Sequence, residues 1–203
     1  MAEIHDLIKN GIIISKKIKN IPFSELLRAT TSFEVYSLNV ADPQDVELLN
    51  DLTSSAKKFI AQINRTHTRF EGGRINEVGK RIEEVFVEEL KKTKLVPTLL
   101  SSAGYPDIKI RDSHDRVTFI ESKAISGDWD SSLRSFYYTS GKKIDSAGRH
   151  LLIAWDISKE RDNYWKVNGW KLIDLVNLEI TTKMEFQSNN QKLYIPSLIL
   201  AES

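Results

Sequence analysis

Two short stretches of the sequence carry carboxylates and an ammonium group at a spacing that could build a reactive site. Pro106-Asp107 is followed, fourteen residues after the aspartate, by Glu121-Ser122-Lys123. Residues two apart in a strand share a face, so Glu121 and Lys123 project together while Ser122 points away. Clustered carboxylates repel one another, and a hard divalent cation such as magnesium or manganese relieves that repulsion. Such a cation can polarise a phosphate and lower the pKa of bound water, and Lys123 would orient the water.

The two stretches read as the strands of a β-hairpin. Residues 106–111 (PDIKIR) alternate in polarity, residues 116–125 (RVTFIESKAI) are β-branched and aromatic, and four residues (DSHD) join them. Asp107 takes the polar side of its strand because Ile108 and Ile110 take the other. The hairpin can therefore bring both carboxylates and the lysine into one small volume.

The residues before this hairpin carry helical periodicity. Residues 1–65 read as helical, with Asp42 as an N-cap and Pro43 at the first position of one helix. A second long helix is expected from about Ile75 to Lys92, with a core-facing apolar stripe.

The residues after the hairpin are mixed in character. Residues 128–149 are polar and should contain a helix that starts near Asp130 or Ser131, and residues 150–157 (HLLIAWDI) are typical of a strand buried on both faces. Residues 158–169 read as a polar connection and residues 193–200 as a late strand. This order predicts an α/β fold: a central mixed β-sheet flanked by helices, with a helical N-terminal layer.

The PD…ESK pattern resembles the PD-(D/E)xK nuclease superfamily, and within it the type II restriction endonucleases. The resemblance covers residues 70–160 and implies a restriction-endonuclease-like core that hydrolyses phosphodiester bonds of duplex DNA with magnesium, for which manganese substitutes. It also implies that Asp107 and Glu121 bind the metal, that the backbone carbonyl of Ser122 joins them, and that Lys123 assists the nucleophile.

Members of this superfamily often add a carboxylate from the helix before the first strand. The candidates are Glu77, Glu83 and Glu84. On a helical wheel Gly79, Glu83 and Phe86 lie on one line beside the apolar stripe, whereas Glu77 and Glu84 face outward. We therefore expect Glu83 to complete the catalytic set, with Glu77 and Glu84 as alternatives.

The stretch after the ESK strand should contact the substrate. It offers basic, aromatic and hydroxyl side chains, which suit contacts to phosphates and to base edges together. In restriction enzymes this stretch often approaches DNA. We expect DNA contacts from Ser131, Ser132, Arg134, Tyr137, Tyr138, Lys142 and Lys143.

Composition limits the alternatives. The 203 residues include 29 Lys plus Arg and 28 Asp plus Glu, and the net charge of +1 argues against a polybasic coating protein. The absence of cysteine excludes a thiolate zinc site and a cysteine nucleophile. No apolar run is long enough for a bilayer and no signal-peptide pattern opens the chain, so we expect a cytoplasmic protein without a membrane partner.

The leading hypothesis is a type II restriction endonuclease that cuts a short palindromic duplex sequence as a homodimer. We expect one nuclease domain over residues 1–203: residues 1–65 for dimerisation, residues 70–160 as the catalytic core, and residues 161–203 as C-terminal strands completing the fold. One alternative is a structure-selective repair or recombination nuclease of the same superfamily, which would prefer branched DNA. Another is a non-catalytic DNA-binding subunit, which ranks last because the carboxylates and the lysine are all present.

Overall fold

The structure is a computed structural model that describes residues 2–100, 104–129, 136–183, 188, 190–193 and 195–199. The chain forms two compact units, one of residues 22–178 and one of residues 1–21 with 179–203. The second unit contains helix α1 (Ala2–Lys17), strand β9 (Glu179–Ile180), helix α5 (Asn190–Leu193) and a 3₁₀ turn (Pro196–Leu198). Strand β1 (Ile21–Pro22) lies at the boundary and pairs with β9. No helix in the described part of the chain is long and apolar enough to span a membrane.

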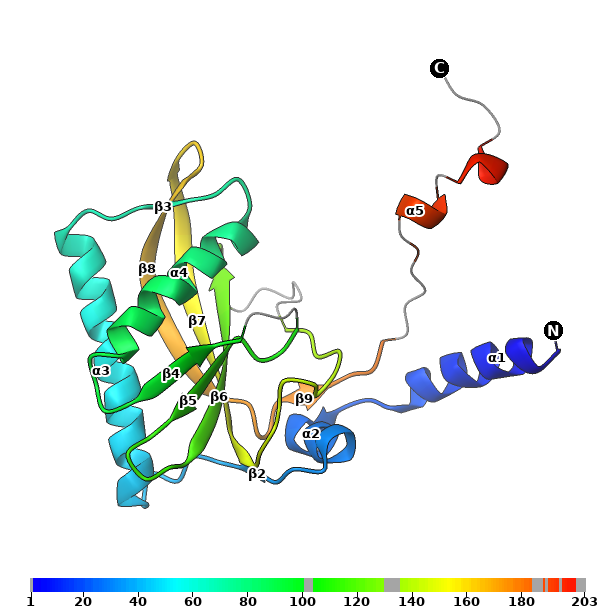
Figure 1. Cartoon of the computed structure of the whole chain (residues 1–203), viewed down its shortest axis with the longest axis horizontal. Coiled ribbons are helices and arrows are strands. Elements are labelled where there is room, and N and C mark those ends of the chain that lie inside the picture. The colour runs from blue at the N-terminus through cyan, green and yellow to red at the C-terminus, as the bar shows by residue number, and fades with distance from the viewer. Residues whose placement is uncertain are drawn as a thin grey trace. The chain divides into compact units, whose positions relative to one another are not determined.

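A seven-stranded mixed sheet forms the centre of the larger unit (Figure 1). Strands β6 and β7 are parallel, as are β2 and β7, and the other neighbouring strands are antiparallel. This arrangement confirms the predicted mixed α/β architecture. The spatial order is β3 (Phe70–Glu71), β8 (Tyr164–Asp174), β7 (Gly148–Arg161), β6 (Val117–Ile125), β5 (Ile108–Arg111) and β4 (Val96–Leu99), while β2 (Val35–Tyr36) joins β7 outside this path.

Helices α3 (Pro43–Arg65) and α4 (Ile75–Leu90) cover one face of the sheet (Figure 1). Helix α3 begins as predicted, because the Asp42 carboxylate accepts the Gln44 backbone N–H at 2.9 Å. The main core lies beneath these helices, where the centroid of the Trp155 ring lies 5.0 Å from that of Phe59 and 4.9 Å from that of Phe86. Most of the apolar stripe predicted for each helix is buried, but on α4 the predicted Val85 is 37% exposed and Val87 is buried instead.

The opposite face of the sheet carries a second cluster built from aromatic rings. Phe119 and His150 stack on neighbouring strands with ring centroids 5.0 Å apart. Helix α2 (Phe23–Thr31) supplies Phe23, whose ring packs edge-to-face on Tyr105 with the ring centroids 5.2 Å apart. The N-terminal helices therefore do not form one layer, because α2 and α3 pack on opposite faces of the sheet.

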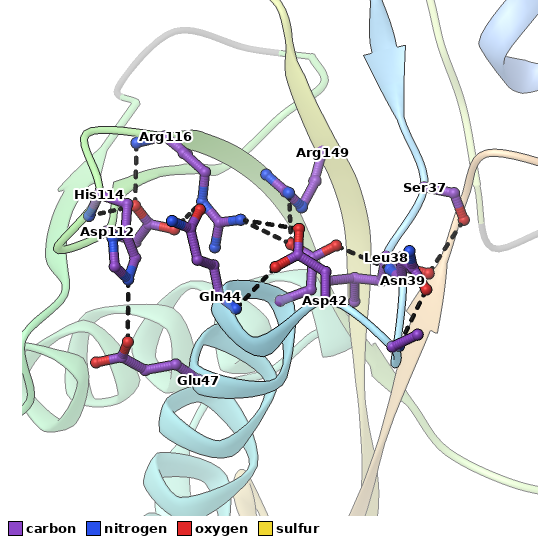
Figure 2. A network of polar contacts seen from close by, with 12 residues as sticks. Ser37, Leu38, Asn39, Asp42, Gln44, Glu47, Asp112, His114, Arg116 and Arg149 are labelled. Atoms are coloured by element: carbon purple, nitrogen blue, oxygen red, sulfur yellow. Dashed lines mark hydrogen bonds and ion pairs between the residues drawn. The ribbon is translucent and has the colours of Figure 1, made fainter.

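A buried ionic network fastens the β5–β6 hairpin to α3 (Figure 2). Asp45, only 3% exposed, accepts from Nη1 of Arg116 at 3.0 Å and also pairs with Arg149. Arg116 Nε in turn donates to Asp112 at 2.8 Å, within the turn of the hairpin. Because two guanidinium groups share the Asp45 carboxylate, the hairpin turn and the start of β7 are held at the beginning of α3. This anchor helps to fix the strand that carries Glu121.

Two predictions for the C-terminal half are wrong. Residues 158–169 are not a connection: β7 continues to Arg161, and β8 begins at Tyr164. The end of this hairpin is exposed to solvent, so its strands are polar and lack the apolar pattern used for the prediction. Residues 193–200 include no strand among those described, because Pro196, which has no N–H for a ladder, opens a 3₁₀ turn.

The expected start of a helix near Asp130 or Ser131 lies outside the described residues. The described residues 136–147 form turns and irregular structure without a helix or strand.

Candidate active site

Asp107 lies immediately before β5, where the chain meets the middle of β6. Its backbone N–H donates to the Ile120 carbonyl at 3.0 Å, and its Oδ2 accepts the Ser122 backbone N–H at 2.9 Å. The Ser122 hydroxyl faces the other side of the sheet and accepts from the indole of Trp155 at 3.1 Å. The predicted alternation along the ESK strand is confirmed, because the Ser122 side chain points into the core while its backbone N–H binds Asp107.

Glu121 and Lys123 project together from β6. Lys123 Nζ lies 2.8 Å from Oε1 of Glu121, while the other oxygen, Oε2, is buried and has no hydrogen-bond partner in the described part of the structure. Burial and then the charge of Asp107 raise the pKa of Glu121 to about 7, although Lys123 acts to lower it. Burial and the neighbouring Asp107 therefore outweigh the stabilisation that Lys123 gives to the ionised Glu121.

Helix α4 brings a third carboxylate to this region. The helix packs closely on β6 at Gly79, where an added Cβ would lie 3.6 Å from the Ala124 side chain. One turn later, Glu83 is half-buried. Burial, and then the charges of Asp107 and Glu121, raise the pKa of Glu83 to about 8. The structure thus groups Glu83 electrostatically with the two hairpin carboxylates.

The alternative glutamates are placed differently. Glu77 is exposed, and its carboxylate caps the start of α4 by accepting the backbone N–H of Gly73 at 2.9 Å and that of Arg74 at 3.3 Å. Glu84 is exposed on the outer side of the helix. Of the three candidates, Glu83 is the half-buried one, whereas Glu77 and Glu84 are both exposed.

The carboxylate pair fits a divalent cation. Among the described residues no three His, Cys, Asp or Glu side chains converge into a ready-made metal site. Magnesium, however, commonly binds through one or two carboxylates and completes its shell with water and substrate phosphate. The orphaned Oε2 of Glu121 supports this fit, because a buried carboxylate oxygen without a partner is costly unless a donor or cation satisfies it.

The expected DNA-contacting residues separate into an outer and an inner group. Ser131, Ser132 and Arg134 lie outside the described residues. Tyr137 is 52% exposed and Lys142 is exposed as well. These two side chains present an aromatic ring and a positive charge at the surface.

The inner group consists of Tyr138 and Lys143. The Tyr138 ring packs 5.5 Å from Phe23, and its hydroxyl shares a hydrogen bond with Thr30 of α2. Lys143 donates to backbone carbonyls, among them that of Pro106 at 2.6 Å. Both side chains are thus engaged within the protein.

Sequence reasoning missed two features beside the site. The buried Tyr105 hydroxyl bonds Nδ1 of His150 at 2.7 Å, and burial lowers the pKa of His150 to about 4, so the imidazole is neutral. The Nζ of Lys171 on β8 lies 4.4 Å from the centroid of the Trp129 ring. Lys171 and Lys123 both pair with Ala154 of β7, from opposite sides, so the two lysines lie in one row across the sheet. No local pattern signals either feature, because both depend on strand order.

Comparisons with known proteins identify the family to which the chain belongs. Residues 14–197 match the family model described as the type II restriction enzyme MjaV family. The chain is 30% identical to a type II restriction enzyme MjaV of Methanocaldococcus jannaschii, over 98% of this chain and 95% of that protein. No solved structure gives a significant match. The chain therefore belongs to the type II restriction enzyme MjaV family, which confirms the prediction of a type II restriction endonuclease.

Proposed function

We propose that the protein is a magnesium-dependent endodeoxyribonuclease with a restriction-endonuclease-like core, which hydrolyses phosphodiester bonds at a short palindromic duplex sequence. One observation carries the proposal: Asp107 and Glu121 meet beside Lys123, and Oε2 of Glu121 is buried without a partner among the described residues. The family membership supports restriction over the repair or recombination alternative.

Asp107 and Glu121 would hold the cation, with manganese as a substitute for magnesium. The Ser122 N–H points toward Asp107, and in a strand the carbonyl of a residue points to the same side as its N–H, so the Ser122 carbonyl can add a ligand. When bound, the cation supplies Lewis acidity at the scissile phosphate and lowers the pKa of a bound water.

The remaining polar groups would handle the water and the phosphate. Lys123, whose ammonium already lies against Glu121, would orient the attacking water and offset the charge that develops on the phosphate. Glu83, with a pKa of about 8, is poised to hold or release a proton near neutral pH. The outward Tyr137 and Lys142, together with Ser131, Ser132 and Arg134, would contact the DNA.

Helix α1 supports a homodimer. Its residues Ile4, Leu7 and Ile14 share one side of the helix by spacing, and their side chains are 61%, 66% and 53% exposed. An apolar stripe exposed to water is typical of an association surface. A second copy of the chain would cover it, and two-fold pairing would place one site on each DNA strand.

The dimer is tested by light scattering with and without duplex DNA. The wild type should be a dimer, and Leu7→Lys or Ile14→Lys should yield a monomer. A wild type that is monomeric both free and with DNA contradicts the dimer.

The activity is tested by incubation with unmethylated phage DNA in magnesium and, separately, in EDTA. Discrete fragments in magnesium alone are expected. The variants Asp107→Asn and Lys123→Met should lose cleavage by about 100-fold or more while retaining the fold. Glu83→Gln should also lose activity, and Glu84→Gln on the exposed side of the same helix is its matched control. Near-normal cleavage by Asp107→Asn would show that the site is assigned wrongly.

A further inference from the structure

Lys143 points away from the exposed side of its segment and toward the residues before Asp107. Its Nζ donates to the carbonyl oxygens of Pro106 at 2.6 Å and Leu100 at 3.4 Å, and also to that of Gly104. An ammonium group has three donors, so these bonds use its full capacity. A lysine with all donors engaged by carbonyls is not available to a DNA phosphate in this conformation.

The backbone that carries Lys143 is fixed on both sides. Gly141 packs so closely on α2 that an added Cβ would overlap Cγ2 of Thr31. The Ile144 side chain is buried, and its N–H donates to the Gly141 carbonyl at 2.9 Å. The ammonium therefore has a defined position relative to the sheet.

The carbonyls that accept from Lys143 include those directly before Asp107. Gly104 and Pro106 precede the first residue of β5, so no sheet ladder fixes them. Tyr105 between them is held from the interior through its bond to His150. Carbonyl dipoles gathered at one point repel each other, and the Lys143 charge offsets that repulsion. Asp107 is thus the next residue after a turn that is anchored by Lys143 on one side and by Tyr105 on the other.

We propose that Lys143 is a positioning residue, which holds the turn before Asp107 so that the Asp107 carboxylate meets Glu121. The inference rests on the proposed function, in which these two carboxylates bind the cation. Because Lys143 belongs to the same segment as the outward Tyr137 and Lys142, it links the expected DNA-facing surface to the carboxylate pair. Lys143 acts through Asp107 and does not touch the substrate.

The test compares four lysine variants in the full-length chain. Lys143→Met keeps the aliphatic stem without the charge, and Lys143→Arg restores donors. Lys142→Met removes the exposed neighbouring charge. Lys91→Met is the control, because Lys91 is exposed beyond α4 and pairs with the nearby Glu88 at 2.6 Å. The measurements are cleavage of a duplex carrying a site mapped with the wild type, calorimetric Mn²⁺ binding without DNA, and duplex binding in EDTA at several salt concentrations.

Lys143→Met should cleave saturating duplex about 10- to 100-fold more slowly, as expected for a displaced catalytic group, and should bind Mn²⁺ more weakly. Its DNA affinity and the salt dependence of that affinity should equal those of the wild type. Lys143→Arg should recover part of both losses. Lys142→Met should instead weaken DNA binding and flatten its salt dependence.

Unchanged cleavage and Mn²⁺ binding in Lys143→Met would overturn the proposal. A Lys143→Met profile like that of Lys142→Met would also overturn it, since it would show a phosphate contact. The Asp107→Asn variant distinguishes a failure of the proposed function from a failure of the positioning role. Cleavage by Asp107→Asn would contradict the proposed function. An inactive Asp107→Asn together with a normal Lys143→Met would contradict only the positioning role.

Lys143→Arg carries the test if Lys143→Met does not fold. The guanidinium keeps the donors but is larger and planar, so an intermediate cleavage rate with unchanged DNA affinity supports positioning. A wild-type rate in Lys143→Arg beside an unfolded Lys143→Met would assign Lys143 to folding alone and overturn the proposal.

Discussion

Replacement of Glu121 by glutamine tests whether the carboxylate pair is crowded and desolvated. Burial and the neighbouring Asp107 raise the pKa of Glu121 from 4.5 to about 7, a value that already includes the favourable Lys123. The folded state therefore binds the proton more tightly than the unfolded chain, and stability is lost as the pH rises from about 4.5 through 7. At ~1.4 kcal/mol per pKa unit, the difference corresponds to about 3 kcal/mol.

Glutamine stays neutral, so metal-free Glu121→Gln should be more stable than the wild type by about 3 kcal/mol near pH 8.5. The difference should shrink below ~1 kcal/mol near pH 5, where the folded wild type also carries the proton. Urea denaturation in EDTA, followed by tryptophan fluorescence, measures both values.

Two further comparisons sharpen this experiment. Under the proposed function, magnesium should stabilise the wild type and leave Glu121→Gln nearly unchanged, because the proposed cation would bind the folded state through this carboxylate. Glu84→Gln, on the exposed side of α4, should show no such pH dependence. Parallel stabilities of wild type and Glu121→Gln from pH 5 to 8.5 would refute the reasoning.

Three other outcomes follow from the described contacts. Asp45→Ala should lower the free energy of unfolding in urea by about 3–5 kcal/mol, because it leaves the buried Arg149 and the partly buried Arg116 without their shared carboxylate; a loss below ~1 kcal/mol would contradict this. Gly141→Ala should cost about 1–3 kcal/mol in thermal melting through overlap with Thr31, whereas Gly169→Ala, whose Cβ meets nothing within 4 Å, should escape this overlap cost. The His150 pKa of about 4 lies below its usual 6.5, so its stabilising contribution is complete above pH 6.5 and is lost as the pH falls toward 4; an NMR titration that protonates it near 6.5 would contradict the burial argument.

Local signals in the sequence were sufficient for much of the fold and for the grouping of Glu121 with Lys123 in the candidate site. The period of 3.6 residues located α3 and α4, because each helix buries one stripe against the sheet. The period of two placed Glu121 and Lys123 on one face and Ser122 on the other. The same reasoning selected Glu83, since the wheel position beside the apolar stripe is the one that α4 turns toward β6. It failed for the end of the β7–β8 hairpin, where residues 158–163 are exposed and carry no alternation of apolar and polar side chains.

The sequence by itself determined which residue types share a strand face or a helix side, because those relations depend only on backbone geometry over a few residues. Tertiary structure alone decided what each charge does. Lys142 and Lys143 are adjacent in the chain, yet one is exposed and the other binds the carbonyls before Asp107. Likewise Asp45 reads as an ordinary first-turn acid, but packing makes it the shared partner of Arg116 and Arg149. These roles arise from contacts between residues far apart in sequence, which no local period encodes.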